Sequence, residues 1–148
     1  AAKMQNSRIV VVTQEKFAEI IDAAKEIGAE ALINPQPERG ISSSMQIGLE
    51  SAKDADACLF TVSDQPWLTA ETIIALHDAF QSENKGMACT VWGEKTGNPC
   101  IFSEKYYKEL MAISGDKGGK QIIKKHPEDV TYLKISDERE LQDVDVPL

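Results

Sequence analysis

The first candidate for chemistry in this sequence is an acid, Asp64, that directly follows a short apolar run. The run, Cys58–Val62, is bounded by polar residues and Pro66, which favours a buried strand covered on both faces over a short helix. In open α/β sheets, ligands bind beyond the carboxyl ends of the strands, so Asp64 lies where such a fold places its chemistry. An aspartate before a proline is also common in turns, where it caps its own backbone. Both interpretations stay open on these residues alone.

Three further polar segments could bind a ligand. Residues 42–44 are serines at the predicted start of a helix, where they either cap the helix or hold an anion or a nucleotide edge. Residues 114–120, SGDKGGK, could hold a phosphate through backbone N–H groups, with a solvated turn as the alternative. They are not a Walker A loop, because its spacing and its Lys–Ser/Thr ending are absent. Near the end of the chain, Asp143 and Asp145 alternate with apolar residues.

The elements that must position these residues alternate between strand and helix. Residues 8–13 predict a strand, 14–27 a helix and 30–33 a second strand, a unit that favours a parallel pair. The expected packing face of the first helix consists of Phe17, Ile20, Ile21, Ala24 and Ile27. After the run at 58–62, we expect a helix over 69–81 with Thr69 as its N-cap. Two short strands over 86–92 and 99–102 then suggest a hairpin or a sheet-crossing loop, and helices over 103–113 and 121–126 and an edge strand over 130–135 follow.

The composition favours one globular domain over residues 1–148, with 42% hydrophobic residues and no repeat. The net charge of −8 argues against nucleic acid as a partner, because a phosphate backbone requires a basic surface. Three widely spaced cysteines indicate neither a disulfide framework nor a zinc site, so a cytoplasmic location is the default. No apolar stretch is long enough to span a membrane, and residues 1–7 lack the apolar centre of a signal peptide.

Five motifs in order carry a resemblance to a known family: RGISSSMQIGL, SDQPW, TGNPCIF, SGDKGGKQII and DVDVP. Together, over Arg8 to the end of the chain, they resemble the molybdenum cofactor cytidylyltransferases and related molybdopterin-nucleotide transferases. The resemblance implies a Rossmann-like, three-layer α/β nucleotidyltransferase fold with a mostly parallel sheet. It also implies an enzyme of molybdenum cofactor biosynthesis that joins CMP from CTP, or GMP from GTP, to the terminal phosphate of molybdopterin and releases pyrophosphate.

The resemblance assigns Mg²⁺ as the cofactor and two catalytic acids as its ligands. The acid of the family's D-x-P pattern corresponds to Asp64, and the acid of the closing motif corresponds to Asp145, with Asp143 as the adjacent alternative. Carboxylate-bound Mg²⁺ can neutralise phosphate charge and hold the reacting oxygens in line without a covalent protein intermediate. We therefore predict that Asp64 and Asp145 approach one another at the carboxyl edge of the sheet.

The same resemblance implies residues for the two substrates. Those expected against the nucleotide are Gly40, Ser43 and Ser44. Those expected on the molybdopterin side are Gly97, Asn98, Pro99, Gly115, Asp116, Lys117 and Gly118. The family pattern usually has histidine before the proline at 99 and threonine before the proline at 147. This chain has asparagine and valine there, which leaves the acceptor open.

The family also opens with a strand and a glycine-rich loop that holds the triphosphate, and residues 1–7 do not provide them. We therefore expect a central gap in the sheet and about fifty further residues upstream, by the usual length of a strand–loop–helix unit. We also expect a helix beyond the closing motif, and we expect this chain by itself to lack activity.

Three functional readings and their partners remain open. Besides the molybdopterin enzyme, they are a non-catalytic α/β binding or assembly module and a nucleotidyltransferase with another phosphorylated acceptor. The partners implied are a nucleoside triphosphate, a molybdopterin-type small molecule and a molybdoenzyme that receives the product, with no nucleic acid and no membrane. The sequence does not distinguish CTP from GTP and does not give the oligomeric state.

Overall fold

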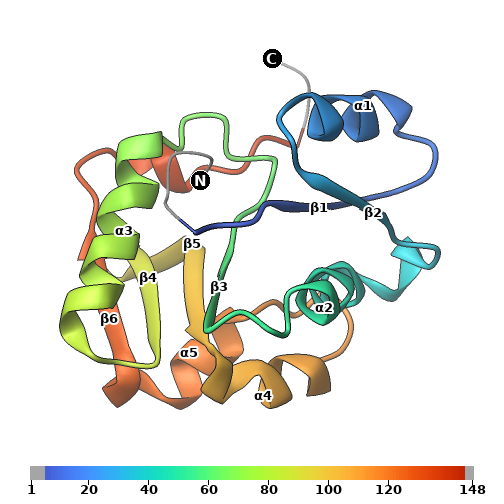
Figure 1. Cartoon of the computed structure of the whole chain (residues 1–148). Coiled ribbons are helices and arrows are strands. Elements are labelled where there is room, and N and C mark those ends of the chain that lie inside the picture. The colour runs from blue at the N-terminus through green and yellow to red at the C-terminus, as the bar shows by residue number, and fades with distance from the viewer. Residues whose placement is uncertain (1–5, 146–148) are drawn as a thin grey trace.

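A computed structural model describes residues 6–145, in which strands and helices alternate along the chain (Figure 1). Strand β1 (Val10–Thr13), helix α1 (Ala18–Glu26) and strand β2 (Glu30–Ile33) form the first unit. The two strands pair in parallel, as predicted. Helix α2 (Ile41–Ser51) packs on β1, where a Cβ at Gly48 would lie 3.3 Å from Cγ2 of Val12. Glycine at this position therefore allows the helix to approach the strand closely.

The second sheet has four strands in the order β3-β5-β4-β6. They are β3 (Ala57–Phe60), β4 (Met87–Trp92), β5 (Lys95–Ser103) and β6 (Val130–Lys134). Strand β5 runs antiparallel to both neighbours and β6 runs parallel to β4, so three of the four strands share one direction. This is the expected α/β fold with a mostly parallel sheet. It also confirms the predicted hairpin, and β6 lies at the predicted edge.

Helices cover both faces of the four-stranded sheet, which gives three layers. On one face, Ile101 of β5 packs with Leu76 of α3 (Ala70–Glu83). On the other, the next residue of β5, Phe102, packs with Leu110 of α4 (Tyr107–Ala112) and Ile123 of α5 (Lys120–Lys125). Adjacent residues of a strand point to opposite faces, so one strand serves both layers. No helix within residues 6–145 is long and apolar enough to cross a membrane.

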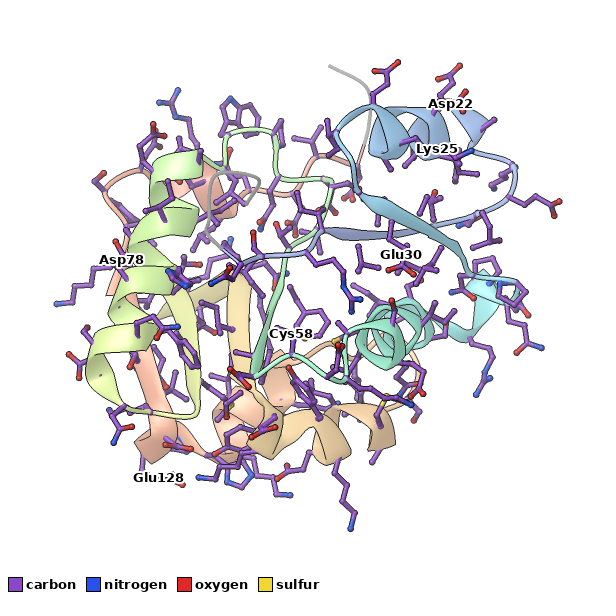
Figure 2. All side chains as sticks on the ribbon, in the orientation of Figure 1. Asp22, Lys25, Glu30, Cys58, Asp78 and Glu128 are labelled. Carbon is purple, nitrogen blue, oxygen red and sulfur yellow. The ribbon has the colours of Figure 1, made fainter. Side chains whose placement is uncertain are left out.

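The acidic excess of the chain lies in part on its surface. Asp22, Asp78 and Glu128 project outward from α1, from α3 and from the turn before β6 (Figure 2). The start of α3 follows the prediction, since the Thr69 side chain accepts a hydrogen bond from the backbone N–H of Thr72. This contact satisfies one of the N–H groups that a helix start leaves without an intrahelical partner.

The first helix differs from its prediction in start and burial. It begins at Ala18 rather than residue 14, and of the expected packing face only Ala24 is buried. Phe17, Ile20 and Ile27 have exposed fractions of 41%, 42% and 61%. The physical reason is that, within the described part of the chain, α1 covers only the two-stranded β1–β2 sheet, which is too narrow to bury a whole helix face.

The strand before Asp64 also differs from its prediction. It ends at Phe60 rather than residue 62, and its four residues are all partly exposed instead of buried on both faces. Within the described residues it pairs only with β5, so it is an edge strand of its sheet, and β1 lies in a separate sheet. An edge position leaves one side of a strand without a neighbouring strand.

Candidate active site

The chain around Asp64 and the chain around Asp145 lie side by side. The backbone N–H of Val144 donates to the carbonyl oxygen of Asp64 at 2.8 Å. The side-chain amide of Gln65 donates to a carboxylate oxygen of Asp143 at 3.2 Å. The structure thus brings together the two acidic segments that were predicted to meet. That Asp64 and Asp145 share one ion stays a prediction.

A second pair of contacts fixes this arrangement at the start of α3. The backbone N–H and the hydroxyl of Thr69 both donate to one carboxylate oxygen of Glu140, each at 3.3 Å. Glu140 is only 7% exposed, so its carboxylate depends on these donors. The N-terminal end of a helix also favours a negative charge. Residues 64–69 and 140–144 are therefore joined at four points.

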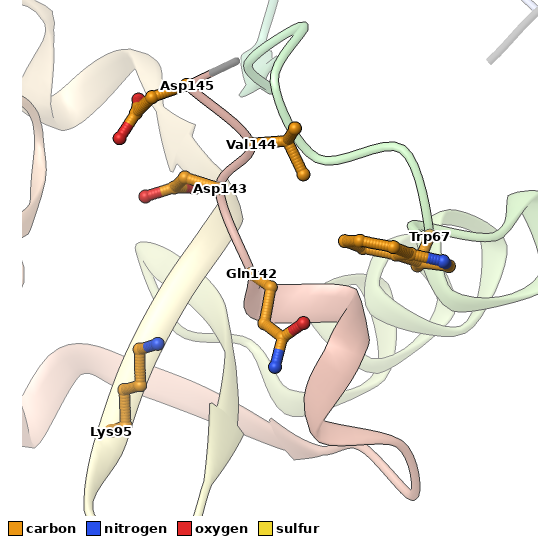
Figure 3. Close-up of a pocket in the computed structure, with 6 residues that line it drawn as sticks. All are labelled: Trp67, Lys95, Gln142, Asp143, Val144 and Asp145. Atoms are coloured by element: carbon orange, nitrogen blue, oxygen red, sulfur yellow. The ribbon is translucent and has the colours of Figure 1, made fainter. Parts of the chain in front are cut away.

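A cavity of about 630 Å³ opens beside Asp143 and Asp145, and Asp64 does not line it. It is lined by Trp67, Lys95, Gln142, Asp143, Val144 and Asp145 (Figure 3). The carboxylates of Asp143 and Asp145 point to the same side of the chain, and Val144 between them points to the other side. Lys95, at the start of β5, adds a cation to the same cavity. The cavity therefore combines two carboxylates with a group that can bind a phosphate.

One oxygen of Asp64 is suited to a cation. Oδ1 of Asp64 is buried and has no hydrogen-bond partner within residues 6–145, and the same holds for Oε1 of Gln65. A buried carboxylate oxygen without a partner is destabilising, and a bound cation would relieve this cost. The described part of the chain has no group of three or more His, Cys, Asp and Glu residues that could hold a metal ion by themselves. Mg²⁺ commonly needs only one or two carboxylates plus substrate phosphates, so the residues present fit this ion.

The serine segment lies inside the first turn of α2 and does not cap it. Gly40 occupies the N-cap position with a φ of 88°, and no side chain caps this helix start. The Ser43 hydroxyl instead donates to the carbonyl oxygen of Gly40 at 2.9 Å. The capping interpretation of the serines is therefore wrong, because glycine takes the cap position and places them within the first turn of the helix. Their predicted contact with a nucleotide stays a prediction.

The SGDKGGK turn lies against this helix start. The backbone N–H of Ser42 donates to the carbonyl oxygen of Gly115 at 3.1 Å. A Cβ at Gly40 would lie 2.5 Å from the carbonyl carbon of Gly115 and 2.6 Å from a carboxylate oxygen of Asp116. Gly40 is thus the residue that permits the contact. The structure brings the residues predicted for the nucleotide next to those predicted for the acceptor, with Lys117 exposed and Gly118 partly buried.

Residues 97–99 of β5 lie next to Leu141, just ahead of the segment that bears Asp143 and Asp145. Gly97 is buried, and a Cβ there would lie 2.6 Å from Cδ2 of Leu141. The carbonyl oxygen of Asn98 accepts a hydrogen bond from the Thr90 hydroxyl at 3.1 Å, and Pro99 is fully buried after a cis peptide bond. None of the three lines the cavity beside the acids, and their predicted contact with the acceptor stays untested.

Four polar residues near these segments were not predicted as site residues: Asn34, Gln65, Lys95 and Glu140. Gln65 stands within the SDQPW motif, so its place in the sequence could have indicated it. Glu140 and Lys95 gave no comparable signal, because their neighbours at the site are distant in sequence. Only the fold identifies them.

Known proteins share this fold. Rv0371c from Mycobacterium tuberculosis H37Rv is 19% identical with a TM-score of 0.70, over 87% of this chain and 66% of that chain. A nucleotidyl transferase from Methanothermobacter thermautotrophicus is 17% identical with a TM-score of 0.77, over 97% and 68%. Molybdopterin-guanine dinucleotide biosynthesis protein A from Archaeoglobus fulgidus is 13% identical with a TM-score of 0.58, over 84% and 62%.

This chain therefore spans about two thirds of the length of these structures. At such identities the likeness concerns the fold. No curated protein matches the chain. The family described as "MobA-like NTP transferase domain", however, matches residues 1–130, which is most of the sequence. The chain belongs to the family of MobA-like NTP transferase domains.

Proposed function

We propose that this protein is a metal-dependent nucleotidyltransferase that joins a nucleoside monophosphate to the phosphate of a molybdopterin-type acceptor. The observation that carries the proposal is the buried oxygen of Asp64 that has no hydrogen-bond partner among the described residues 6–145. The backbone of Asp64 is also hydrogen-bonded to the segment bearing Asp143 and Asp145. Membership of the MobA-like family supports a nucleoside triphosphate as the donor. The Archaeoglobus structure, a molybdopterin-guanine dinucleotide biosynthesis protein, supports the acceptor class.

Asp64 and Asp145 are proposed to hold the metal, for which we propose Mg²⁺. A structure of Rv0371c in complex with manganese, 17% identical with a TM-score of 0.72, supports a divalent cation. The bound ion would neutralise charge on the reacting phosphates. Gln65 holds the neighbouring Asp143 through its amide and so orients the acidic segment. Lys95 lies in the same cavity and can bind a phosphate oxygen.

The reaction needs no covalent protein intermediate. An oxygen of the acceptor phosphate attacks the α-phosphorus of the nucleotide, and a new phosphorus–oxygen bond forms. The bond to the bridging oxygen of the β-phosphate breaks, and pyrophosphate leaves with that electron pair. The protein contributes the position of the two phosphates and the electrostatic environment in which charge moves from one oxygen to the other.

The test is pyrophosphate release by the native protein, expressed from its complete gene, with CTP or GTP, excess Mg²⁺ and molybdopterin. We expect Asp64→Asn to lower turnover by at least about a hundredfold, since removing one electrostatic group from such a site costs that much. The matched control is Asp78→Asn, the same change at an exposed residue of α3 (Figure 2). Both variants must keep the circular dichroism spectrum of the native protein.

Three results would overturn parts of this proposal. Unchanged turnover in Asp64→Asn would remove Asp64 from the mechanism. A larger loss in Asp143→Asn than in Asp145→Asn would move the second metal ligand to Asp143. Nucleotide binding by the native protein without pyrophosphate release with any phosphorylated acceptor would identify a binding module rather than an enzyme.

A further inference from the structure

We infer that the cavity of about 630 Å³ receives the acceptor, with the planar ring of the acceptor stacked on Trp67 and its phosphate bound by Lys95. This inference rests on the proposed function and gives it a second subsite. It moves the acceptor away from residues 97–99 and 115–118, to which the family resemblance assigns it. The resemblance gives no role to Trp67 or Lys95.

Residues 97–99 leave little surface for a ligand. Gly97 and Pro99 are buried, and the side chain of Leu141 lies against Gly97. Strand β5 is exposed at its first residue, Lys95, and this residue of the strand lines the cavity. A ligand that enters the cavity therefore reaches β5 at Lys95 and not at the buried residues that follow it.

Trp67 is a large aromatic side chain that the core does not use. It is half-buried and is not among the residues of either hydrophobic cluster of the structure. Within residues 6–145, its ring makes no ring–ring or cation–π contact, and its indole N–H has no hydrogen-bond partner. A buried indole N–H usually finds a partner, and tryptophan is enriched where one end of the ring stays accessible. The ring of Trp67 can therefore stack with a flat ligand, because stacking needs only a π face.

The cavity has an aromatic part and a charged part. Trp67 and the side chain of Val144 lie on one side of the acidic segment, whereas both carboxylates and Lys95 lie on its other side (Figure 3). A ligand that fills both parts must combine a flat ring with an anionic group, as a phosphorylated pterin does. The cavity volume is also within the range of about 300–1,000 Å³ that is typical of small-molecule sites.

Two polar side chains of the cavity are available to a ligand. Within the described residues, neither the ammonium group of Lys95 nor the side-chain amide of Gln142 has a hydrogen-bond or ion-pair partner. The ammonium group suits a phosphate oxygen. The carboxamide offers a donor and an acceptor side by side, which match the N–H and carbonyl edge of a pterin ring. The two groups therefore suit the two parts of the same ligand.

The charged part of the cavity is negative by itself. It contains two carboxylates and only one ammonium group, so Lys95 does not offset their repulsion of a phosphate. The cation proposed for Asp64 and Asp145 would supply the missing positive charge. We therefore expect the phosphate of the acceptor to bind only with the divalent cation, and the ring to bind with or without it.

The first test is binding of a pterin monophosphate to the native protein in excess Mg²⁺, followed by the fluorescence anisotropy of the pterin. We expect Trp67→Leu to raise Kd about tenfold, which is the effect of one lost stacking contact. Trp67→Phe keeps an aromatic ring and should restore most of the affinity. Trp92→Leu is the matched control, since it makes the same change at an exposed tryptophan that does not line the cavity.

Lys95→Gln tests the phosphate contact. We expect it to raise Kd for the pterin monophosphate about tenfold and to leave Kd for the pterin without phosphate unchanged. Lys95→Arg keeps the charge and should restore the affinity, and Lys108→Gln, at an exposed lysine of α4, is the control. Removal of Mg²⁺ should weaken only the phosphorylated pterin. In turnover assays the variants of Trp67 and Lys95 should raise KM for the acceptor and leave KM for the nucleotide unchanged.

Several outcomes overturn the inference. A tryptophan that only holds Val144 in place would lower the urea midpoint in Trp67→Leu and leave Kd for the pterin unchanged. A loss of affinity for CTP or GTP instead of the pterin would assign the cavity to the nucleotide. A larger loss in Lys117→Gln than in Lys95→Gln would return the acceptor to the SGDKGGK turn.

These outcomes are separable from a failure of the proposed function. If they occur while Asp64→Asn still abolishes turnover, only this inference fails. If no phosphorylated acceptor supports pyrophosphate release, the proposed function fails. A Kd for the pterin monophosphate that depends on Trp67 and Lys95 would then still support this cavity as its binding site.

Discussion

The contact of Gly40 with Gly115 leads to a prediction about stability that the structure quantifies. Gly40 has a φ of 88° and a ψ of −178°, a region that is essentially restricted to glycine. In Gly40→Ala, the new Cβ would lie 2.5–2.6 Å from the carbonyl group of Gly115 and from Asp116. Two of these three atoms belong to the backbone, so the SGDKGGK turn must move away from α2.

The expected cost has two parts. The conformation of residue 40 costs about 1–3 kcal/mol for a residue with a side chain. The displacement of the turn breaks the hydrogen bond from Ser42 N–H to Gly115, which adds about 1 kcal/mol. We therefore expect Gly40→Ala to lower the free energy of unfolding by about 2–4 kcal/mol in sum.

Gly28→Ala provides the matched control. Gly28 has a φ of 73°, but a Cβ there would meet no atom of residues 6–145 within 4 Å, so this variant has a conformational cost without such a contact. Urea unfolding followed by circular dichroism measures both. The contact accounts for about 1 kcal/mol of difference between the two variants. At urea slopes of about 1–3 kcal/mol/M, the midpoint should therefore fall by about 0.3–1 M more for Gly40→Ala than for Gly28→Ala. Equal shifts in the two variants would refute the reasoning that the turn rests on Gly40.

Three further predictions concern the framework of the site. Leu76→Ala removes a side chain with no exposed surface and should cost about 2–5 kcal/mol in urea unfolding, and a loss under 1 kcal/mol would contradict its place in the core. Thr69→Ala removes the cap of α3 and a donor to Glu140, so we expect a loss of about 1–2 kcal/mol, and no loss would show that water replaces both contacts. Hydrogen bonds from Tyr106, Lys105 and Gly86 lower the pKa of Asp129 from 3.8 to about 2, so its contribution to stability is present above pH 4 and is lost as the pH falls toward 2. Tyr106→Phe should raise the pKa of Asp129 and reduce the loss of stability at low pH. NMR titration of the carboxylate and urea unfolding between pH 2 and 5 measure the two effects. An unchanged pKa would contradict the role of the Tyr106 hydrogen bond.

The sequence predicted those elements whose pattern is local. The β1–β2 pair follows from two apolar strands around one helix, and the bounds of β2 were predicted to the residue. The first helix began too early in the prediction because Phe17 has helical spacing to later apolar residues. In the structure its N–H instead donates to the carbonyl oxygen of Gln14 in a turn ahead of the helix. Apolar spacing does not distinguish these two conformations.

The rest of the site depends on contacts that no local pattern encodes. The burial of β3 was overestimated because its position in the sheet depends on β5, which follows more than thirty residues later. Asp64 and Asp145 were predicted from motifs, whereas Glu140 and Asn34 make contacts through side chains that reach α3 and α2 from other elements. Such polar pairs have no periodicity, since each requires only one residue in the right place.

The segment that carries Asp143 and Asp145 can open locally, and this opening would disassemble the candidate site before the protein unfolds. Residues 142–145 belong to no helix or strand. Within residues 6–145, the hydrogen bonds that tie them to the rest of the protein are those of Gln142 with Arg139, of Asp143 with Gln65 and of Val144 with Asp64. Opening this segment breaks few interactions, so it requires less free energy than global unfolding. The acids can therefore separate while the sheet stays intact, and amide hydrogen exchange at Val144 reports this sub-global opening directly. A ligand that bridges the two acidic segments would slow exchange at Val144 and leave the exchange of β4 unchanged.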